Sequence, residues 1–230
     1  MNLKVDFGDY IKMNKNNIKI LNNPVVLSNL CIMRDKDTAT YGVRLAARQI
    51  SRCLLYEASK GLPLIKRDIT TPLTTFQTET IDSDIDIIIS PILRAGLIFT
   101  DEAIDILPKA CIRHIGMYRD ENTLKPVWYY NKVPVELKHP QKTYVFITDP
   151  MLATGNSLLE AIKLYADKGV PIKNIKVICI IAAPEGIEHI QNNYPEIEII
   201  TAAVDEYLNE KGYIVPGLGD AGDRFFNTCL

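Results

Sequence analysis

The sequence has little of what marks several common classes of protein. Its five cysteines are odd in number and contain no Cys-x-x-Cys pair, which argues against a disulfide scaffold or a zinc site. Cys111 and Cys179 lie in apolar runs, and we expect both to be small core residues. The three histidines are widely scattered, which favours structural roles over metal binding.

An excess of charge of either sign is also missing. The chain has 26 Lys and Arg against 28 Asp and Glu, a formal net charge of −2. That balance gives no general reason to expect nucleic acid or an anionic membrane as a partner. No apolar run approaches the roughly 20 residues of a membrane-spanning helix. Lys4, Asp6 and Asp9 interrupt any signal-peptide pattern, so we expect a cytoplasmic protein.

The length of 230 residues suits a single α/β domain spanning 1–230. Residues 1–23, rich in Asn and Lys, are interpreted as an edge element or an extension. Residues 69–80, rich in Thr and containing Pro72, are predicted to form an edge strand or a hairpin. Elsewhere, helices are predicted at 37–60, 95–107, 156–168 and 186–193, and strands at 85–89, 111–117, 144–148, 175–182 and 197–203.

This alternation of strands and helices predicts a parallel sheet with helices on both faces, because the strands are apolar on both sides. Ligands of such sheets bind beyond the carboxyl ends of the strands. The residues that we expect at that edge are Ser90, Tyr118, Asp149, Ala183 and Asp205.

The most informative segment runs from Tyr144 to Ser157. An apolar strand leads to one carboxylate, Asp149, then to small residues around Gly155, then to helical spacing from Ser157. Such a loop directs backbone N–H groups and a helix N-terminus at one spot, which suits a phosphate monoester. A single carboxylate beside it can accept hydrogen bonds from two sugar hydroxyls. The segment therefore predicts a binding site for ribose 5-phosphate.

An ordinary β–turn–α connection with small residues is the alternative, since most such turns bind no ligand. The segment is not a P-loop, because no Gly-Lys-Ser/Thr closes it. Nor is it a dinucleotide fingerprint, because the Gly-x-Gly-x-x-Gly spacing is missing.

Residues 149–157, with the sequence DPMLATGNS, resemble the phosphoribosyl-pyrophosphate (PRPP) loop of phosphoribosyltransferases, in the version of the uracil phosphoribosyltransferases. Three further segments agree in content and order, and the resemblance extends from about Pro24 to the C-terminus. They are PILRAGL at 91–97, GMYRDE at 116–121 with YYNK at 129–132, and GYIVPGLGDAGDR at 212–224.

The resemblance implies a fold and an activity. The fold is an α/β phosphoribosyltransferase core, Rossmann-like, with a flexible β-arm at about 118–140 and a small hood from the terminal segments, its base-binding part at about 205–230. The reaction is uracil plus PRPP giving UMP and pyrophosphate, in pyrimidine salvage. Mg²⁺ is the implied cofactor, held mainly by PRPP and not by a protein metal site. A homodimer or homotetramer is implied as well, with GTP as an allosteric effector in some members.

The resemblance also implies the site residues. Asp149 fixes the ribose hydroxyls and stabilises positive charge on the sugar, while Arg94 and Arg119 bind pyrophosphate. Asp220 lies where base and PRPP meet and is the only candidate for a general base. Besides these four, the implied PRPP-binding residues are Pro150, Met151, Leu152, Ala153, Thr154, Gly155, Asn156 and Ser157. Uracil binds to backbone groups of Ile214, Gly219 and Ala221, together with Asp220.

Without the resemblance, several of these residues have simpler explanations. Arg94 would be a surface arginine paired with Asp101 or Glu102, and the segment at 213–223 a glycine-rich turn. Asp223 and Arg224 pair with each other or with neighbours in the simplest interpretation.

Two positions distinguish this chain from related sequences. Thr148 precedes Asp149 where many phosphoribosyltransferases carry a second acid, and this supports the uracil branch. Asn156 stands where the family usually has glycine. Because Asn tolerates left-handed backbone angles better than other residues that have a side chain, we expect phosphate binding to survive.

Two other functions are considered. One is transfer to another base, such as orotate or a purine, but orotate would need an added Arg or Lys for its carboxylate. The other is a pyrimidine regulator that keeps the fold and binds RNA or effector nucleotides. The near-neutral charge and the four complete motifs favour the enzyme.

Overall fold

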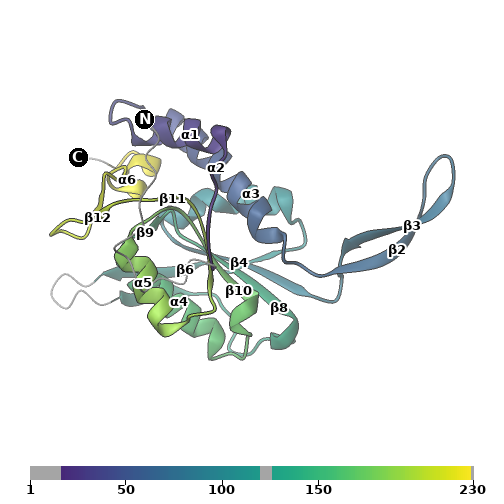
Figure 1. Cartoon of the computed structure of the whole chain (residues 1–230). Helices are drawn as coiled ribbons and strands as arrows, with labels where there is room; N and C mark the ends of the chain where they lie inside the picture. Colours follow the sequence, from purple (N-terminus) through teal and green to yellow (C-terminus); the bar gives the residue numbers. More distant parts are fainter. Residues whose placement is uncertain (1–16, 120–125, 229–230) are drawn as a thin grey trace.

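The computed structural model describes residues 17–119 and 126–228, and its centre is a nine-stranded sheet within those ranges (Figure 1). The strand order is β1–β11–β10–β8–β4–β6–β7, with β5 beside β4 and β9 beside β10. The pairings are parallel except β6 with β7, which is antiparallel. The strands are β1 (Ile18–Ile20), β4 (Asp86–Leu93), β5 (Cys111–Ile112), β6 (Ile115–Arg119), β7 (Pro126–Asn131), β8 (Thr143–Thr148), β9 (Met151–Leu152), β10 (Ile175–Ala182) and β11 (Glu198–Val204).

Helices cover both faces of this sheet, as the alternation predicts (Figure 1). One face carries α1 (Pro24–Arg34), α2 (Thr40–Ser59) and α3 (Thr100–Ile106), the last preceded by a 3-10 turn at Ala95–Phe99. The other face carries α4 (Asn156–Ala166) and α5 (Pro184–Asn193). Short 3-10 turns at Pro140–Lys142 and Ile172–Asn174 precede β8 and β10.

The central strand β10 shows why the sheet needs two helical layers. All eight of its residues are buried. Ile178 and Ile180 belong to the core beneath α1, α2 and α3, whereas Val177 and Cys179 belong to the core beneath α4 and α5. Because successive side chains of a strand point to opposite faces, a continuous apolar run is stable only when both faces are covered.

Two smaller sheets lie outside this core. The hairpin of β2 (Leu64–Thr70) and β3 (Thr75–Ile81) projects away from the body and pairs only within itself in the described chain (Figure 1). Residues 69–80 therefore belong to a hairpin and not to an edge strand of the main sheet. Near the C-terminus, β12 (Tyr207–Leu208) pairs with β13 (Ile214–Val215), and α6 (Ala221–Phe226) follows.

The structure corrects several predicted details. Helix α1 was not predicted, and the expected helix at 95–107 is divided into a 3-10 turn and α3. The strand expected at 111–117 is divided into β5 and β6. Ser90 lies inside β4, because that strand continues through Pro91 to Leu93, and is not at the strand end. Cys111 is exposed, whereas Cys179 is buried as expected.

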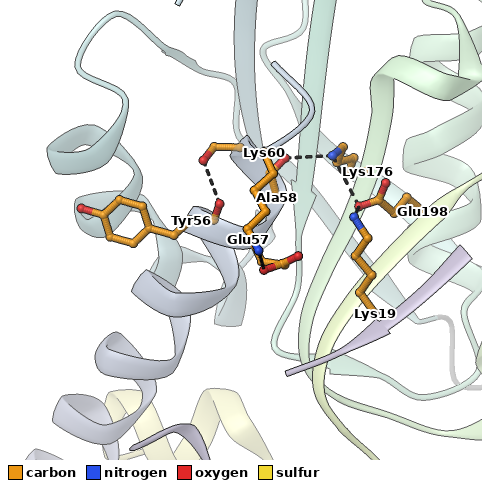
Figure 2. A network of polar contacts seen from close by, with 8 residues as sticks. Lys19, Tyr56, Glu57, Ala58, Lys60, Lys176 and Glu198 are labelled. Carbon is orange, nitrogen blue, oxygen red and sulfur yellow. Dashed lines mark hydrogen bonds and ion pairs between the residues drawn. The ribbon is translucent and has the colours of Figure 1, made fainter. Parts of the chain in front are cut away.

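A buried lysine joins α2 to the amino ends of the strands (Figure 2). Lys176 Nζ, at the start of β10, donates to the Ala58 carbonyl oxygen at 2.9 Å and lies 3.4 Å from Glu198 Oε1. Lys19 Nζ approaches the same oxygen at 3.0 Å. Burial lowers the pKa of Lys176, and the neighbouring carboxylate of Glu198 partly opposes this. The network fixes the end of α2 on the sheet edge that lies opposite the predicted site.

In the described ranges, 17–119 and 126–228, every helix is too short or too polar to span a lipid bilayer.

Candidate active site

The 149–157 loop connects the carboxyl end of β8 to the N-terminus of α4. The Asp149 backbone N–H still donates to the Ile178 carbonyl of β10 at 3.1 Å, so the residue is held at the sheet edge. One carboxylate oxygen, Oδ1, accepts a hydrogen bond from the Met151 N–H at 3.2 Å. Asp149 as a residue is partly buried.

The turn into α4 depends on Gly155, which has a φ of 80° and is the residue immediately before the helix. Asn156 is the first residue of α4, and Asn227 is the only residue with a side chain that has a positive φ in the described ranges. The expectation that Asn156 needs left-handed tolerance is therefore wrong. Gly155 supplies that conformation, so the backbone shape of the turn does not depend on glycine at 156.

The same loop packs closely against the start of α5. A Cβ atom added to Gly186 would lie 2.1 Å from the Ala153 carbonyl oxygen, and one added to Gly155 would lie 2.9 Å from the Gly186 carbonyl oxygen. Both distances are too short for real side chains. Gly186 is thus a residue that shapes the loop, although the sequence motif does not include it.

The electrostatic surroundings of Asp149 are unusual for a carboxylate. The pKa of Asp149 is raised to about 7, mainly by burial and also by the negative charge of Asp220, while the hydrogen bond from the Met151 N–H opposes both effects. The charge of Asp220 thus acts on Asp149, although the two residues are distant in sequence. Positive charge placed between them would lower the pKa of Asp149 and favour its ionised form.

The segment at 91–97 lies beside this loop. A Cβ atom on Gly96 would be 2.5 Å from the Thr148 carbonyl oxygen, so the segment contacts the end of β8 directly before Asp149. The peptide bond between Leu93 and Arg94 is cis. These contacts place the Arg94 backbone at the carboxyl edge of the sheet.

The Arg94 side chain extends into solvent toward the hood. Its Nη2 atom is 3.8 Å from Asp223 Oδ1, and its guanidinium carbon lies 5.9 Å from the centre of the Phe226 ring. The simpler pairing with Asp101 or Glu102 is wrong, because Glu102 is buried between Arg48 and Arg52. With 59% of its side chain exposed, Arg94 is free to contact an anionic ligand.

Arg119 is the last residue of β6, which places its backbone at the carboxyl edge. Its side chain, and residues 120–125 of the predicted arm, lie outside the described part of the chain. The adjoining strands β6 and β7 pair in antiparallel fashion, with an irregular register between Gly116 and Met117.

The hood consists of residues 205–228 in the described chain and lies beside α1 (Figure 1). Gly217 and Gly219 have φ angles of 59° and 81°, and the peptide bond between Val215 and Pro216 is cis. Asp220 is the N-cap of α6, and its Oδ1 atom accepts from the Asp223 N–H at 2.9 Å. Ile214 and Ala221 are both buried.

Arg224 connects the hood to the end of α1. Its guanidinium donates to the backbone carbonyls of Leu218 at 3.0 Å and Asp35 at 2.7 Å, and it also contacts the Met33 carbonyl. Arg224 therefore binds backbone oxygens and not Asp223. The Cβ atom of Ala95 would lie 4.0 Å from a Cβ on Gly222, so the hood also contacts the segment at 91–97.

Three of the sequence-predicted segments thus meet at one place, namely the 149–157 loop, the segment at 91–97 and the hood. No group of three or more His, Cys, Asp or Glu residues suited to a metal exists in the described ranges. Asp149 and Asp220 together provide two carboxylates. This set fits Mg²⁺ that keeps most of its ligands from water and substrate phosphates, as is usual for that ion.

The sequence also matches a known protein family. The sequence model of the uracil phosphoribosyltransferases matches residues 20–228. The chain belongs to the uracil phosphoribosyltransferase family. A uracil phosphoribosyltransferase of Dictyoglomus thermophilum is 48% identical over 209 residues, which cover 91% of this chain and 98% of the relative. One of Legionella pneumophila is 44% identical over 218 residues, covering 95% and 99%.

Two solved structures share the fold of this chain. The AQ2163 protein of Aquifex aeolicus matches with a TM-score of 0.84 at 35% identity, covering 93% of this chain and 99% of that one. An adenine phosphoribosyltransferase of Trypanosoma brucei, in complex with AMP, pyrophosphate and ribose-5-phosphate, matches with a TM-score of 0.54 at 13% identity. It covers 89% of this chain and 88% of that one, and it supports the fold alone.

Proposed function

We propose that the protein transfers the phosphoribosyl group of PRPP to uracil, producing UMP and pyrophosphate for pyrimidine salvage. Membership of the family supports this activity. The observation that carries the proposal is the position of a single carboxylate, Asp149, at a sheet edge directly before a glycine turn and a helix N-terminus. That arrangement suits one sugar phosphate.

The 149–157 loop binds the ribose 5-phosphate part of PRPP in this proposal. The N–H groups at the start of α4, from Gly155 to Ser157, surround the 5′-phosphate, since these groups have no partners within the helix. Ala153 and Thr154 complete the loop, and residues 150–152 fix its backbone against β10. Asp149 accepts hydrogen bonds from the two ribose hydroxyls.

Asp149 must be ionised to stabilise positive charge as it develops on the sugar ring. In the free protein its pKa of about 7 keeps a substantial fraction protonated near neutral pH. Arginine side chains and Mg²⁺ brought with PRPP lower that pKa, because an opposite charge favours the ionised form. Asp149 is therefore more fully ionised in this proposal when the arginines and Mg²⁺ lie beside it.

Arg94 and Arg119 neutralise the departing pyrophosphate. Arg94 leaves a weak, exposed contact with Asp223 when it does so, which costs little because exposed ion pairs contribute about 0–1 kcal/mol. Mg²⁺ supplies further charge neutralisation at the pyrophosphate oxygens when it is bound. Asp149 and Asp220 are the residues of this chain that would help to hold it.

Uracil recognition is assigned to main-chain groups of the hood. Uracil offers two carbonyl acceptors on either side of an N–H donor, which suit backbone N–H and C=O groups of Ile214, Gly219 and Ala221. Cytosine would leave such buried partners mismatched, and this discriminates by a factor on the order of 10⁴ or more. Asp220 lies between base and PRPP in the proposal and is the candidate for a general base.

We further propose a homodimer or homotetramer, GTP as an effector, and a cytoplasmic location, where PRPP and UMP are metabolites. The oligomer is tested by the mass of the purified protein in solution. The effector is tested by adding GTP to the assay at fixed PRPP.

The decisive experiment measures UMP formation from labelled uracil and PRPP with Mg²⁺. Cytosine, orotate and hypoxanthine serve as competing bases under the same conditions. Turnover confined to uracil supports the proposal, and turnover with another base replaces it by a transferase for that base. Absence of turnover together with salt-sensitive RNA binding would favour the pyrimidine regulator.

A further inference from the structure

A buried ion pair outside the proposed contacts holds the centre of the hood. Arg34 is the last residue of α1, and Asp205 follows β11 at the carboxyl edge of the sheet. Arg34 Nη1 donates to Asp205 Oδ2 at 2.8 Å, and Nη2 lies 2.5 Å from Oδ1. Only 4% of the Asp205 side chain is exposed. The pair is therefore bidentate and largely shielded from water.

The Arg34–Asp205 pair binds both the N–H and the carbonyl group of Gly217. Arg34 Nη1 donates to the Gly217 carbonyl oxygen at 2.8 Å, and the Gly217 N–H donates to Asp205 Oδ2 at 2.8 Å. The N–H of Asp205 is itself bound to the Ala182 carbonyl of β10 at 2.8 Å. Gly217 is thus connected to the sheet through Asp205 and to α1 through Arg34.

Gly217 in turn fixes the backbone that the proposed function assigns to uracil. A Cβ atom on Gly217 would lie 2.1 Å from the Ile214 carbonyl oxygen, so the two residues are in close backbone contact. The next residue, Leu218, has its carbonyl held by Arg224 at 3.0 Å, and Gly219 follows directly. The loop from Ile214 to Gly219 is therefore held at its middle by the side chains of Arg34, Asp205 and Arg224.

We propose that Arg34 and Asp205 are positioning residues for uracil, which act through Gly217 on the main-chain groups of Ile214 and Gly219. The inference rests on the proposed function, because it assigns a purpose to the base-binding loop. Main-chain groups cannot be changed by mutation and have no freedom to adjust as side chains do. Their accuracy must come from what holds the backbone, and recognition of a flat base depends on that accuracy.

The structure offers a matched control. Lys176, like Arg34, is a cation that binds one carboxylate and one backbone carbonyl, but its carbonyl belongs to Ala58 at the end of α2. Losing Lys176 removes an ion pair of the same type far from the hood. A general loss of stability would affect both variants, whereas a loss of base positioning would affect only Arg34 variants.

The test compares steady-state kinetics of the wild type, Arg34→Met, Arg34→Lys and Lys176→Met, with PRPP and uracil varied in turn. We expect Arg34→Met to raise the KM for uracil about tenfold or more, since a buried charge-assisted contact is lost. The KM for PRPP should stay within about twofold, because the 149–157 loop is untouched. Lys keeps the charge but cannot reach both acceptors, so Arg34→Lys should give an intermediate KM. Lys176→Met should leave both KM values unchanged.

Several results would overturn the inference. Equal KM values for uracil in the wild type and both Arg34 variants would show that the pair does not position the base. An equal rise in both KM values, or the same rise in Lys176→Met, would show a general structural role. If Arg34→Met fails to fold, the test uses Arg34→Lys alone. A rise in its KM for uracil that exceeds the rise in its KM for PRPP supports the inference, and an equal rise contradicts it. A wild type that makes no UMP defeats the proposed function itself, which is a different outcome from active enzyme with unaffected variants.

Discussion

The two ends of β10 and β11 carry similar ion-pair networks with different consequences. At the amino ends, Lys176 joins Glu198 and the last turn of α2 (Figure 2). At the carboxyl end, Asp205 joins Arg34 and the hood. Each network connects an N-terminal helix to the sheet through a cation, a carboxylate and a backbone carbonyl. Lys19 also contacts Glu198 at the amino ends, and the Gly217 N–H also binds Asp205 at the carboxyl end, so the contacts are similar in kind but not identical.

The two networks differ in the kind of backbone segment that they hold in place. Ala58 ends a helix that is packed into the core. Gly217 belongs to a loop with glycines at positive φ, and although Ile214 and Leu218 on either side of it are buried, both of its own backbone groups are bound by side chains. A helix end retains its conformation when one contact is lost, but such a loop does not. We therefore expect changes at the carboxyl edge to alter kinetics, and changes at the amino edge to alter stability alone.

The largest expected effect at the carboxyl edge is that of Asp149→Asn. The amide oxygen can still accept the hydrogen bond from Met151, but the side chain can no longer become anionic. We expect kcat to fall about 100-fold or more, as for other losses of transition-state charge stabilisation. UMP formation measures this, with thermal unfolding as the control for folding. Unchanged turnover would remove the main catalytic assignment.

The same carboxylate predicts a pH dependence of stability. Because its pKa is raised from 3.8 to about 7 on folding, the native state holds a proton that the unfolded state releases over this range. The stabilising contribution of this group to the free energy of unfolding is fully present below about pH 4, and it is lost as the pH rises to about 7. The difference is at most a few kcal/mol. Urea unfolding of the wild type and Asp149→Asn between pH 4 and 8 should show the two curves separating, with the wild type losing more stability. Parallel curves would contradict a raised pKa.

Gly186→Ala tests the 149–157 loop, the part of the carboxyl edge that is proposed to bind phosphate. Its new methyl group would collide with the Ala153 carbonyl and push the 149–157 loop away from α5. We expect the KM for PRPP to rise about tenfold, with a smaller change for uracil. The control is Gly169→Ala, because the nearest atom to its added Cβ, in Pro140, is 3.6 Å away and Gly169 lies outside the loop. Gly169 has a positive φ, unlike Gly186, so this control adds backbone strain without a collision at the loop. If both variants change the KM for PRPP equally, the effect is not local to the loop.

Lys176→Met tests the amino edge. The substitution leaves the Ala58 carbonyl without this donor, while Glu198 keeps its contact with Lys19. We expect a loss of about 1–3 kcal/mol in the free energy of unfolding, with kcat unchanged. Urea denaturation and the UMP assay measure the two quantities on the same preparation. A fall in kcat without loss of stability would break the distinction between the two ends of the sheet.

The sequence alone predicts the structural features that follow from local residue patterns. It does not predict those that depend on contacts between residues far apart in the chain. The parallel core was predictable because apolar runs such as 175–182 have a local pattern. Helix α1 also had a local signal that was missed, namely Asn23 as N-cap followed by Pro24. Ser90 is placed wrongly because the strand is predicted to end at 89, whereas β4 continues and Pro91 pairs with Thr148 inside the sheet.

The contacts that fix the site were not predictable in this way. Arg34 and Asp205 are 171 residues apart, and nothing near either residue indicates the other. The contact of Gly186 with Ala153 likewise appears only when α5 packs beside the 149–157 loop. The motif predicts which residues meet the phosphoribosyl group. It did not reveal which residues hold them in place, because that information is distributed over the tertiary structure.

The smallest expected effect is that of Asp223→Asn, which weakens the contact between the hood and Arg94. The two charges are 3.8 Å apart and both side chains are well exposed, so the contact contributes little to stability. Asn can still accept from Thr228, which preserves the end of α6. Releasing Arg94 makes it more available to pyrophosphate, so we expect the KM for PRPP to fall by no more than about twofold at low salt. The difference should vanish at high salt, where exposed charges are screened. A large rise in the KM for PRPP would mean instead that Asp223 holds Arg94 in its productive position.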